Sequence, residues 1–147
     1  MPVMEGSGEI GFEPAVPLDR TFDAQLGLDV YEVTEDEVRG RLSVVDGHKQ
    51  PFGIVHGGVF AAIAESLASI GTAAVVVPQG MVAMGPSNQT SFLRPISKGS
   101  IEAVARARHK GRTTWVWEVE LSDDQGRLCS LVRMTIAVRP MPGAQPG

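Results

Sequence analysis

Residues 53–69 read GIVHGGVFAAIAESLAS, and this stretch decides the fold. From 59 to 68 the residues are almost entirely apolar, but Glu65 interrupts them with a carboxylate. The segment from about 57 to 77 is long and alanine-rich enough to form a helix, and it is apolar on nearly every side. We therefore predict a buried central helix that carries one carboxylate.

Strand-like sequence flanks the predicted helix on both sides. Before it, LDVYEV and VRGRLSVV are short β-rich runs separated by TEDE, which predicts a hairpin. After it come about four runs with alternating polar and apolar residues, as in 101–107 and 114–121, and we predict that they form an antiparallel meander. Only a sheet wrapped around the helix would bury all its faces. The predicted fold class is therefore α+β, with an antiparallel sheet wrapped around one long central helix.

The length of 147 residues suits one domain. We expect a flexible N-terminal arm at 1–18, a single domain at 19–140 and a disordered tail at 141–147, because both ends are rich in Gly and Pro without periodicity. The formal net charge of -4 gives no general attraction to nucleic acid. The first twenty residues lack an apolar run of signal-peptide length, and TAAVVV is too short to span a bilayer. We expect a cytoplasmic protein without nucleic-acid or membrane partners.

The sequence contains no pattern typical of a metal or cofactor site. Cys129 is the one cysteine, so no internal disulfide can form, and we expect a small buried hydrophobe in a strand. Neither a G-x-S-x-G elbow, a Walker loop nor a dinucleotide glycine pattern is present. His48 and His56 are close in sequence but have no third ligand. We therefore assign neither a metal nor a cofactor.

Glu65 needs an explanation, because an ionised carboxylate in an apolar setting is unfavourable unless it is paired or protonated. One interpretation is structural: the side chain reaches water or a basic partner at a subunit edge. The other is functional: the carboxylate is a general base or nucleophile in a cleft. Ser69 lies one turn later on the same face, where it could orient a water or the carboxylate, or simply allow close helix packing.

Two glycines follow His56 at the predicted start of the helix. Free backbone amides at such a start stabilise developing negative charge, as on a polarised thioester carbonyl. Gly57 and Glu65 are eight residues apart, which is about 12 Å along a helix axis. If both act on one carbonyl, the glutamate must come from a second subunit. This spacing then predicts a homodimer that shares its active sites.

Four motifs, QPFGIVHGGVFAAIAES, SNQTSFLRP, GRTTWVWEVEL and GRLCS, together resemble the hotdog-fold acyl-CoA thioesterases. The resemblance covers roughly residues 25–139. It is greatest to the 4-hydroxybenzoyl-CoA thioesterases that use a glutamate on the central helix, with phenylacetyl-CoA-type thioesterases nearby. It implies a hotdog fold and a hydrolase that converts an acyl-CoA substrate to the free acid and coenzyme A. It also implies a homotetramer built as a dimer of dimers.

The resemblance further implies roles for single residues. Glu65 would be the nucleophile or general base, and the Gly57 amide would polarise the thioester carbonyl. Gln50 would assist at that carbonyl, and His56 would support the turn. Ser69 would hold the place of a family threonine and keep its hydroxyl.

For coenzyme A, the resemblance implies binding by basic and hydroxyl side chains. Arg94 of FLRP and Thr113 of GRTTW fall on matching positions, and Arg112 and Thr114 stand beside the latter. Arg112 replaces a small hydroxyl residue, so the binding of the nucleotide would be rearranged. Taken alone, the basic run at 105–112, ARARHKGR, is more typical of a solvated edge than of a phosphate site.

Hydrolysis of an aromatic acyl-CoA is the function that the sequence favours. The sequence does not distinguish between hydroxybenzoyl, phenylacetyl, dihydroxynaphthoyl and medium-chain acyl groups as the substrate. A non-catalytic acyl-CoA-binding module is the alternative from another functional class. A hotdog dehydratase would need a histidine paired with an acid within the cleft, whereas His56 stands at the helix entry.

Overall fold

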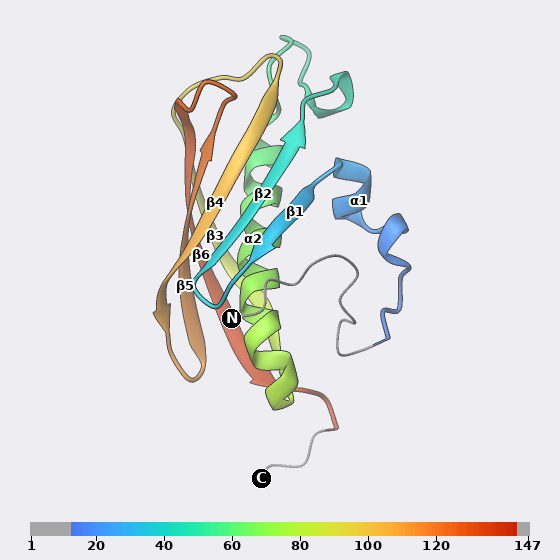
Figure 1. Ribbon diagram of the computed structural model, residues 1–147, viewed down its shortest axis with the longest axis vertical. Coiled ribbons are helices and arrows are strands. Elements are labelled where there is room, and N and C mark those ends of the chain that lie inside the picture. The colour runs from blue at the N-terminus through green and yellow to red at the C-terminus, as the bar shows by residue number, and fades with distance from the viewer. Residues whose placement is uncertain (1–12, 144–147) are drawn as a thin grey trace.

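A computed structural model describes residues 13–143 (Figure 1). The elements follow in the order η1 (Leu18–Arg20), α1 (Phe22–Leu26), β1 (Asp29–Val33), β2 (Glu37–Ser43), η2 (Asp46–His48), α2 (Gly57–Val76), η3 (Val77–Gln79), β3 (Met81–Phe92), β4 (Ser100–Lys110), β5 (Thr114–Ser122) and β6 (Leu128–Pro140). The predicted arm at 1–18 and the predicted tail at 141–147 lie largely outside the described residues.

The six strands form one antiparallel sheet in the order β1-β2-β4-β5-β6-β3. The predicted hairpin is β1–β2, and β4, β5 and β6 form a meander as expected. The meander prediction is wrong for β3, which pairs with β6 at the far edge of the sheet. The physical reason is that β2 occupies the edge of β4 that β3 would need.

The predicted alternation along the strands is confirmed by burial. In β2, β4 and β5, every second side chain faces the core, while the mostly polar or charged side chains in between face outward. The core residues from β4 and β5 are Ile101, Ala103, Ala105, Trp115, Trp117, Val119 and Leu121. These two strands therefore supply a continuous apolar surface on one face of the sheet.

Helix α2 lies across that face (Figure 1). Its buried residues are Val59, Phe60, Ile63, Ala64, Leu67, Ala68, Gly71, Thr72 and Val76. The predicted α+β fold, an antiparallel sheet around one long central helix, is confirmed. Within one chain, however, the sheet does not bury every face of the helix, because Glu65 and Ala74 are exposed.

The apolar run TAAVVV at 72–77 continues this same helix into η3. By length and composition alone, Gly57–Gln79 would suffice to cross a membrane. Half of its most apolar window is buried inside the fold, however. Packing of the core therefore accounts for the apolar composition of this segment.

A close approach at Gly71 holds α2 against the sheet. A Cβ atom built at Gly71 would lie 2.6 Å from Cη2 of Trp117 and 2.7 Å from Cγ2 of Val38. At the next position, Thr72 Oγ1 accepts a hydrogen bond of 2.9 Å from Trp117 Nε1 and donates one of 2.9 Å to the Ala68 carbonyl. The buried indole N–H is therefore satisfied, and the helix is fixed at one height on the sheet.

We expect Gly71→Ala to lower the free energy of unfolding by about 1–2 kcal/mol. Overpacking a core costs about 1–3 kcal/mol, and the contacts of the added methyl group with Trp117 and Val38 are close enough to place this site in the upper part of that range, about 2–3 kcal/mol. Alanine is the better helix former by about 1 kcal/mol, which offsets part of this cost. Urea denaturation measures the difference. The control is Gly47→Ala, where nothing lies within 4 Å of the added Cβ. If Gly71→Ala were as stable as the control, the contact with Trp117 would not limit the packing.

Candidate functional site

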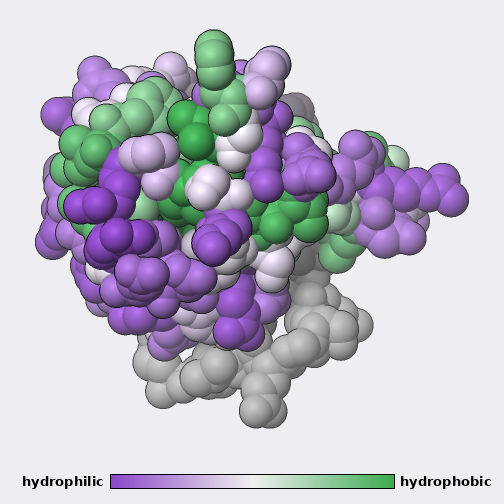
Figure 2. All heavy atoms as spheres, turned by 90° about the horizontal axis from the view of Figure 1, so that it is seen from above, coloured by the Kyte–Doolittle hydropathy of each residue, from purple (hydrophilic) through white to green (hydrophobic). Residues whose placement is uncertain are grey.

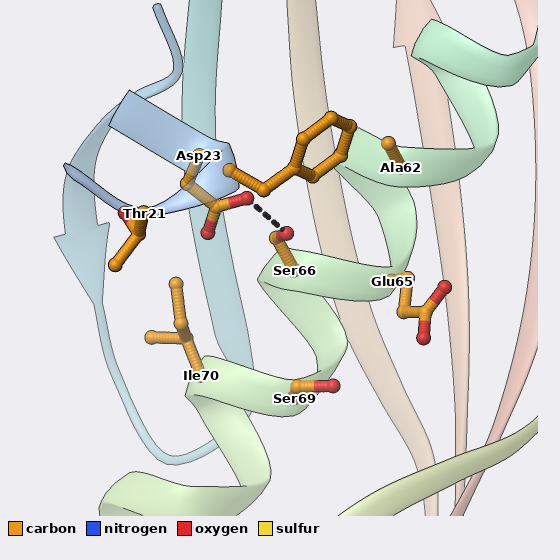
Figure 3. Close-up of a pocket in the computed structure, with 8 residues that line it drawn as sticks. Thr21, Asp23, Ala62, Glu65, Ser66, Ser69 and Ile70 are labelled. Carbon is orange, nitrogen blue, oxygen red and sulfur yellow. Dashed lines mark hydrogen bonds between the residues drawn. The ribbon is translucent and has the colours of Figure 1, made fainter. Parts of the chain in front are cut away.

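Glu65 lies on the side of α2 that the sheet leaves uncovered. A cavity of about 430 Å³ opens there between α1 and α2. Its lining residues are Thr21, Phe22, Asp23, Ala62, Glu65, Ser66, Ser69 and Ile70. Glu65 and Ser69 point to one side of the helix, away from α1, whereas Ser66 and Ile70 point toward α1 (Figure 3). Glu65 and Ser69 therefore share one face, as their spacing indicates.

The carboxylate of Glu65 is exposed. Among the described residues it forms no ion pair and no hydrogen bond, so the structural interpretation finds no basic partner in this part of the chain. Strand β3 passes beside it at Gly85, where a built Cβ atom would lie 3.6 Å from Glu65 Oε1. Because glycine has no side chain, Gly85 leaves the Glu65 carboxylate accessible from the side of β3.

The N-terminus of α2 holds a free amide at Gly57. His56 Nδ1 accepts a hydrogen bond of 2.8 Å from the Gly58 N–H, and the Val59 N–H donates to the His56 carbonyl at 2.9 Å. The Gly57 N–H has no acceptor among the described residues. It lies at the positive end of a 20-residue helix, where negative charge is stabilised. Gly57 thus presents an available donor at this turn.

Apolar side chains surround this end of α2. A Cβ atom built at Gly57 would lie 2.8 Å from the ring of Phe92, which itself packs on Phe60 with ring centroids 6.4 Å apart. Phe52 and Leu93 are also exposed, Phe52 by 91%. Figure 2 looks down on this end and shows apolar surface bordered by strongly polar surface. A carbonyl bound here would meet the Gly57 amide beside apolar groups, which strengthens a hydrogen bond by excluding water.

Gln50 lies in the loop that leads into α2. Its Oε1 accepts a hydrogen bond of 2.8 Å from the Phe52 N–H, so the side-chain orientation is fixed by the loop. Its Nε2 has no partner within the described part of the chain. A bridge between Lys49 and Val55 closes the loop and brings Gln50 back toward the helix start. Gln50 therefore offers a second N–H donor in the segment that also contains Gly57.

The predicted substrate-binding residues lie at opposite ends of the sheet. The Arg94 N–H donates to the Cys129 carbonyl near the start of β6, whereas the Thr113 carbonyl accepts from the Val138 N–H near its end. The nine residue-to-residue steps from 129 to 138 correspond to about 30 Å of extended strand. One chain therefore brings Arg112, Thr113 and Thr114 together but keeps Arg94 away from them.

The basic run at 105–112 divides into paired and unpaired side chains. Arg106 pairs with Glu37 at 3.2 Å, and Arg108 pairs with Glu118 at 3.0 Å, on the outer face of the sheet. This part of the run is a charge-paired edge. Neither Arg112 nor Arg94 has a carboxylate partner among the residues described. These two guanidinium groups are therefore available to an anionic ligand.

Arg139 is a residue that the sequence did not reveal. Its Nη1 donates a hydrogen bond of 2.9 Å to the Thr113 carbonyl, which places a further cation beside this turn. The pairing of β5 with β6 brings the two segments together, although they are 26 residues apart in the sequence. No local motif marks Arg139, so only knowledge of that pairing could have found it.

Helix α1 was also missed, although its sequence contains capping signals. Thr21 Oγ1 accepts a hydrogen bond of 3.4 Å from the Ala24 N–H, and Gly27 ends the helix with φ 78°. Asp23 Oδ1 accepts a hydrogen bond of 2.6 Å from Ser66 Oγ on α2 (Figure 3). Five residues are too few to show a helical period, so only the caps could have indicated this helix.

Two groups with shifted pKa values lie away from the cavity, one in the connection between β5 and β6 and one near the start of β6. Burial raises the pKa of the Cys129 thiol, which is 1% exposed, and this confirms the prediction of a small buried hydrophobe. A hydrogen bond from the Arg127 backbone N–H lowers the pKa of Asp123. Within residues 13–143, no group of three His, Cys, Asp or Glu side chains could hold a metal ion.

Comparisons with known proteins point to one family. The sequence pattern of the thioesterase superfamily matches residues 52–130. A 1,4-dihydroxy-2-naphthoyl-CoA hydrolase from Listeria monocytogenes is 35% identical over 114 residues, which cover 78% of this chain and 92% of that protein. A crystal structure of a mutant of thioesterase PA1618 from Pseudomonas aeruginosa has a TM-score of 0.80 and 32% identity, covering 84% of this chain and 88% of that one. Thioesterase HI1161 from Haemophilus influenzae has a TM-score of 0.77 and 28% identity, covering 82% and 84%.

We expect His56→Ala to lower the free energy of unfolding by about 0.5–2 kcal/mol, because the Gly58 amide loses its cap. His56→Asn should recover most of this loss, since asparagine is a favourable N-cap. Urea denaturation of the three proteins tests both statements. His109→Ala, at an exposed histidine on β4, is the matched control. Equal stability of the His56→Ala and His109→Ala proteins would show that the cap does not hold this turn.

Proposed function

Since the chain belongs to the thioesterase superfamily, we propose that it hydrolyses an aromatic acyl-CoA to the free acid and coenzyme A. The observation that carries this proposal is Glu65, an exposed carboxylate without a partner in the described residues, on a cavity beside an otherwise apolar helix. The apolar lining from Phe22 and Ile70 suits an aromatic acyl group. The naphthoyl-CoA substrate in the name of the Listeria relative supports the same class.

In this proposal Glu65 either attacks the thioester carbonyl carbon or removes a proton from the attacking water. In both routes the bond between carbon and sulfur breaks, a carbon–oxygen bond from water replaces it, and the sulfur of coenzyme A receives a proton. The Gly57 N–H donates to the oxyanion, and such a donor is worth about 10²–10³ in kcat. Gln50 Nε2 is the second donor, while Ser69 orients the water or the carboxylate.

Supporting residues act through this arrangement. His56 occupies the Gly58 amide and leaves the Gly57 amide free for the carbonyl. Arg94, Arg112, Thr113 and Thr114 would bind the phosphates of coenzyme A, with Arg139 as an added cation. These contacts lie far from the reacting carbon and contribute to substrate binding more than to turnover.

In this proposal one site needs residues from two chains. Gly57 and Glu65 lie about 12 Å apart along α2, so one chain cannot apply both to the same carbonyl. Ala61 stands midway between them, and Asn88 of β3 donates a hydrogen bond of 3.0 Å to its carbonyl. A two-fold axis passing near Asn88 would place Gly57 of one chain level with Glu65 of the other.

Strand β3 provides a suitable surface for such an axis. It is an edge strand of 12 residues, and most of its second half is exposed. An exposed edge of this length is a template for pairing with another chain. The same axis would bring Arg94 of one chain toward residues 112–114 of the other. We therefore propose a homodimer with two shared sites, while its pairing into a homotetramer and its cytoplasmic location stay predictions.

We expect Glu65→Gln to lower kcat by about 10²–10⁴-fold, because the amide can act neither as base nor as nucleophile. Thiol release from benzoyl-CoA measures the loss, and an unchanged melting temperature shows that the fold is kept. Glu102→Gln, on the outer side of β4, is the matched control and should keep wild-type turnover. A folded Glu65→Gln protein with near-wild-type kcat would make Glu65 a structural residue.

A further inference from the structure

We propose that α1 forms a wall of the acyl-binding cavity and that Phe22 on this helix selects the acyl group by its size. The proposal rests on the function proposed above, since it concerns the acyl side of the thioester on which Glu65 acts. It assigns a specificity-determining role to a helix that lies outside the four sequence motifs.

The location of Glu65 decides which part of the substrate enters the cavity. A base or nucleophile must lie about 3–3.5 Å from the reacting atoms, so the acyl group begins beside this carboxylate. Glu65 borders the cavity on the side away from α1, and the cavity extends from there across α2 to α1, with Phe22, Ala62 and Ile70 as its apolar lining. No lysine or arginine lines it, and Asp23 adds a negative charge. The phosphates of coenzyme A are therefore excluded from this cavity, and the acyl group is its suitable occupant.

Helix α1 is fixed well enough to act as a wall. Asp23 accepts a hydrogen bond of 2.6 Å from Ser66 on α2. The side chain of Leu26 is buried in the core, with 8% exposed, and its carbonyl accepts a hydrogen bond of 2.7 Å from His48 Nε2. These attachments hold the start and the end of a helix of five residues. The side chain at Phe22 is consequently presented from a rigid position.

Phe22 is 64% exposed, and its ring has no aromatic partner among the described residues. It therefore offers a free face for stacking on a planar acyl group. The polar groups of the wall are already paired: Thr21 Oγ1 donates to the Leu18 carbonyl at 2.8 Å, and Ser66 donates to Asp23. Because the wall can stack on a ligand but offers it no free polar group, it favours an aromatic acyl group. The Phe22 ring limits how large that acyl group can be.

The test compares Phe22→Ala, Phe22→Trp and the wild type on butyryl-CoA, benzoyl-CoA and 2-naphthoyl-CoA. Coenzyme A is common to all three substrates, so the ratio of kcat/KM between two of them reports the acyl cavity alone. Leu18→Ala is the matched control, because Leu18 is 60% exposed near α1 but does not line the cavity. Any general loss of activity cancels in the ratio.

We expect Phe22→Ala to raise the naphthoyl-to-benzoyl ratio about tenfold and Phe22→Trp to lower it about tenfold, in line with the usual effect of pocket size. Leu18→Ala should leave the ratio within about twofold of the wild type. Ratios that stay within that range in both Phe22 variants, or that move in the same direction in both, would overturn the assignment.

A binding measurement separates this proposal from the proposed hydrolysis. If the wild type releases no thiol from any of the three thioesters, the proposed hydrolysis is wrong. The dissociation constants of the same three compounds then test whether α1 forms a wall of the acyl-binding cavity. Opposite shifts of the naphthoyl-to-benzoyl affinity ratio in Phe22→Ala and Phe22→Trp would support it. Equal ratios in both variants and the control would refute it.

Discussion

The packing of α2 against one face of the sheet is the constraint on which the site depends. Gly71 allows the helix backbone to approach Trp117, and the hydrogen bond between Trp117 and Thr72 prevents the helix from rotating about its axis. Once this face is fixed, helical periodicity directs Glu65 to the uncovered side. Glu65 therefore does not disturb the core, because it lies on the exposed side of an otherwise apolar helix.

Two independent distances then support the proposal that two chains share one site. Along α2, the Gly57 amide and Glu65 are too far apart to serve one carbonyl. Along β6, the positions beside Arg94 and Thr113 lie at opposite ends of the strand. An antiparallel arrangement of two chains about β3 would bring both separated pairs together. The distance along the helix and the distance along the strand thus favour the same arrangement of two chains.

Local periodicity explains which parts of this fold could be predicted from the sequence. Helix α2, the β1–β2 hairpin and the buried positions of β4 and β5 follow from repeating patterns of apolar residues. The place of β3 at the far edge does not, because strand order is set by pairings between distant residues. For the same reason, the sequence did not reveal that Arg139 lies beside Thr113. Helix α1 was not predicted because five residues are too few to show helical periodicity. The candidate residues Gln50, His56, Gly57, Glu65 and Ser69 could be proposed from local patterns, because each lies on α2 or the loop that precedes it, while their roles stay predictions.

The shared site is tested most directly by mixing two defective chains. Glu65→Ala chains and Gly57→Leu chains are each unfolded, mixed in equal amounts and refolded together. A mixed dimer holds one site with both defects and one with an intact glycine and an intact glutamate. Random pairing should restore about a quarter of wild-type activity, because half the dimers are mixed and each has one good site. A refolded mixture that contains heterodimers but is no more active than its parents would contradict the shared site.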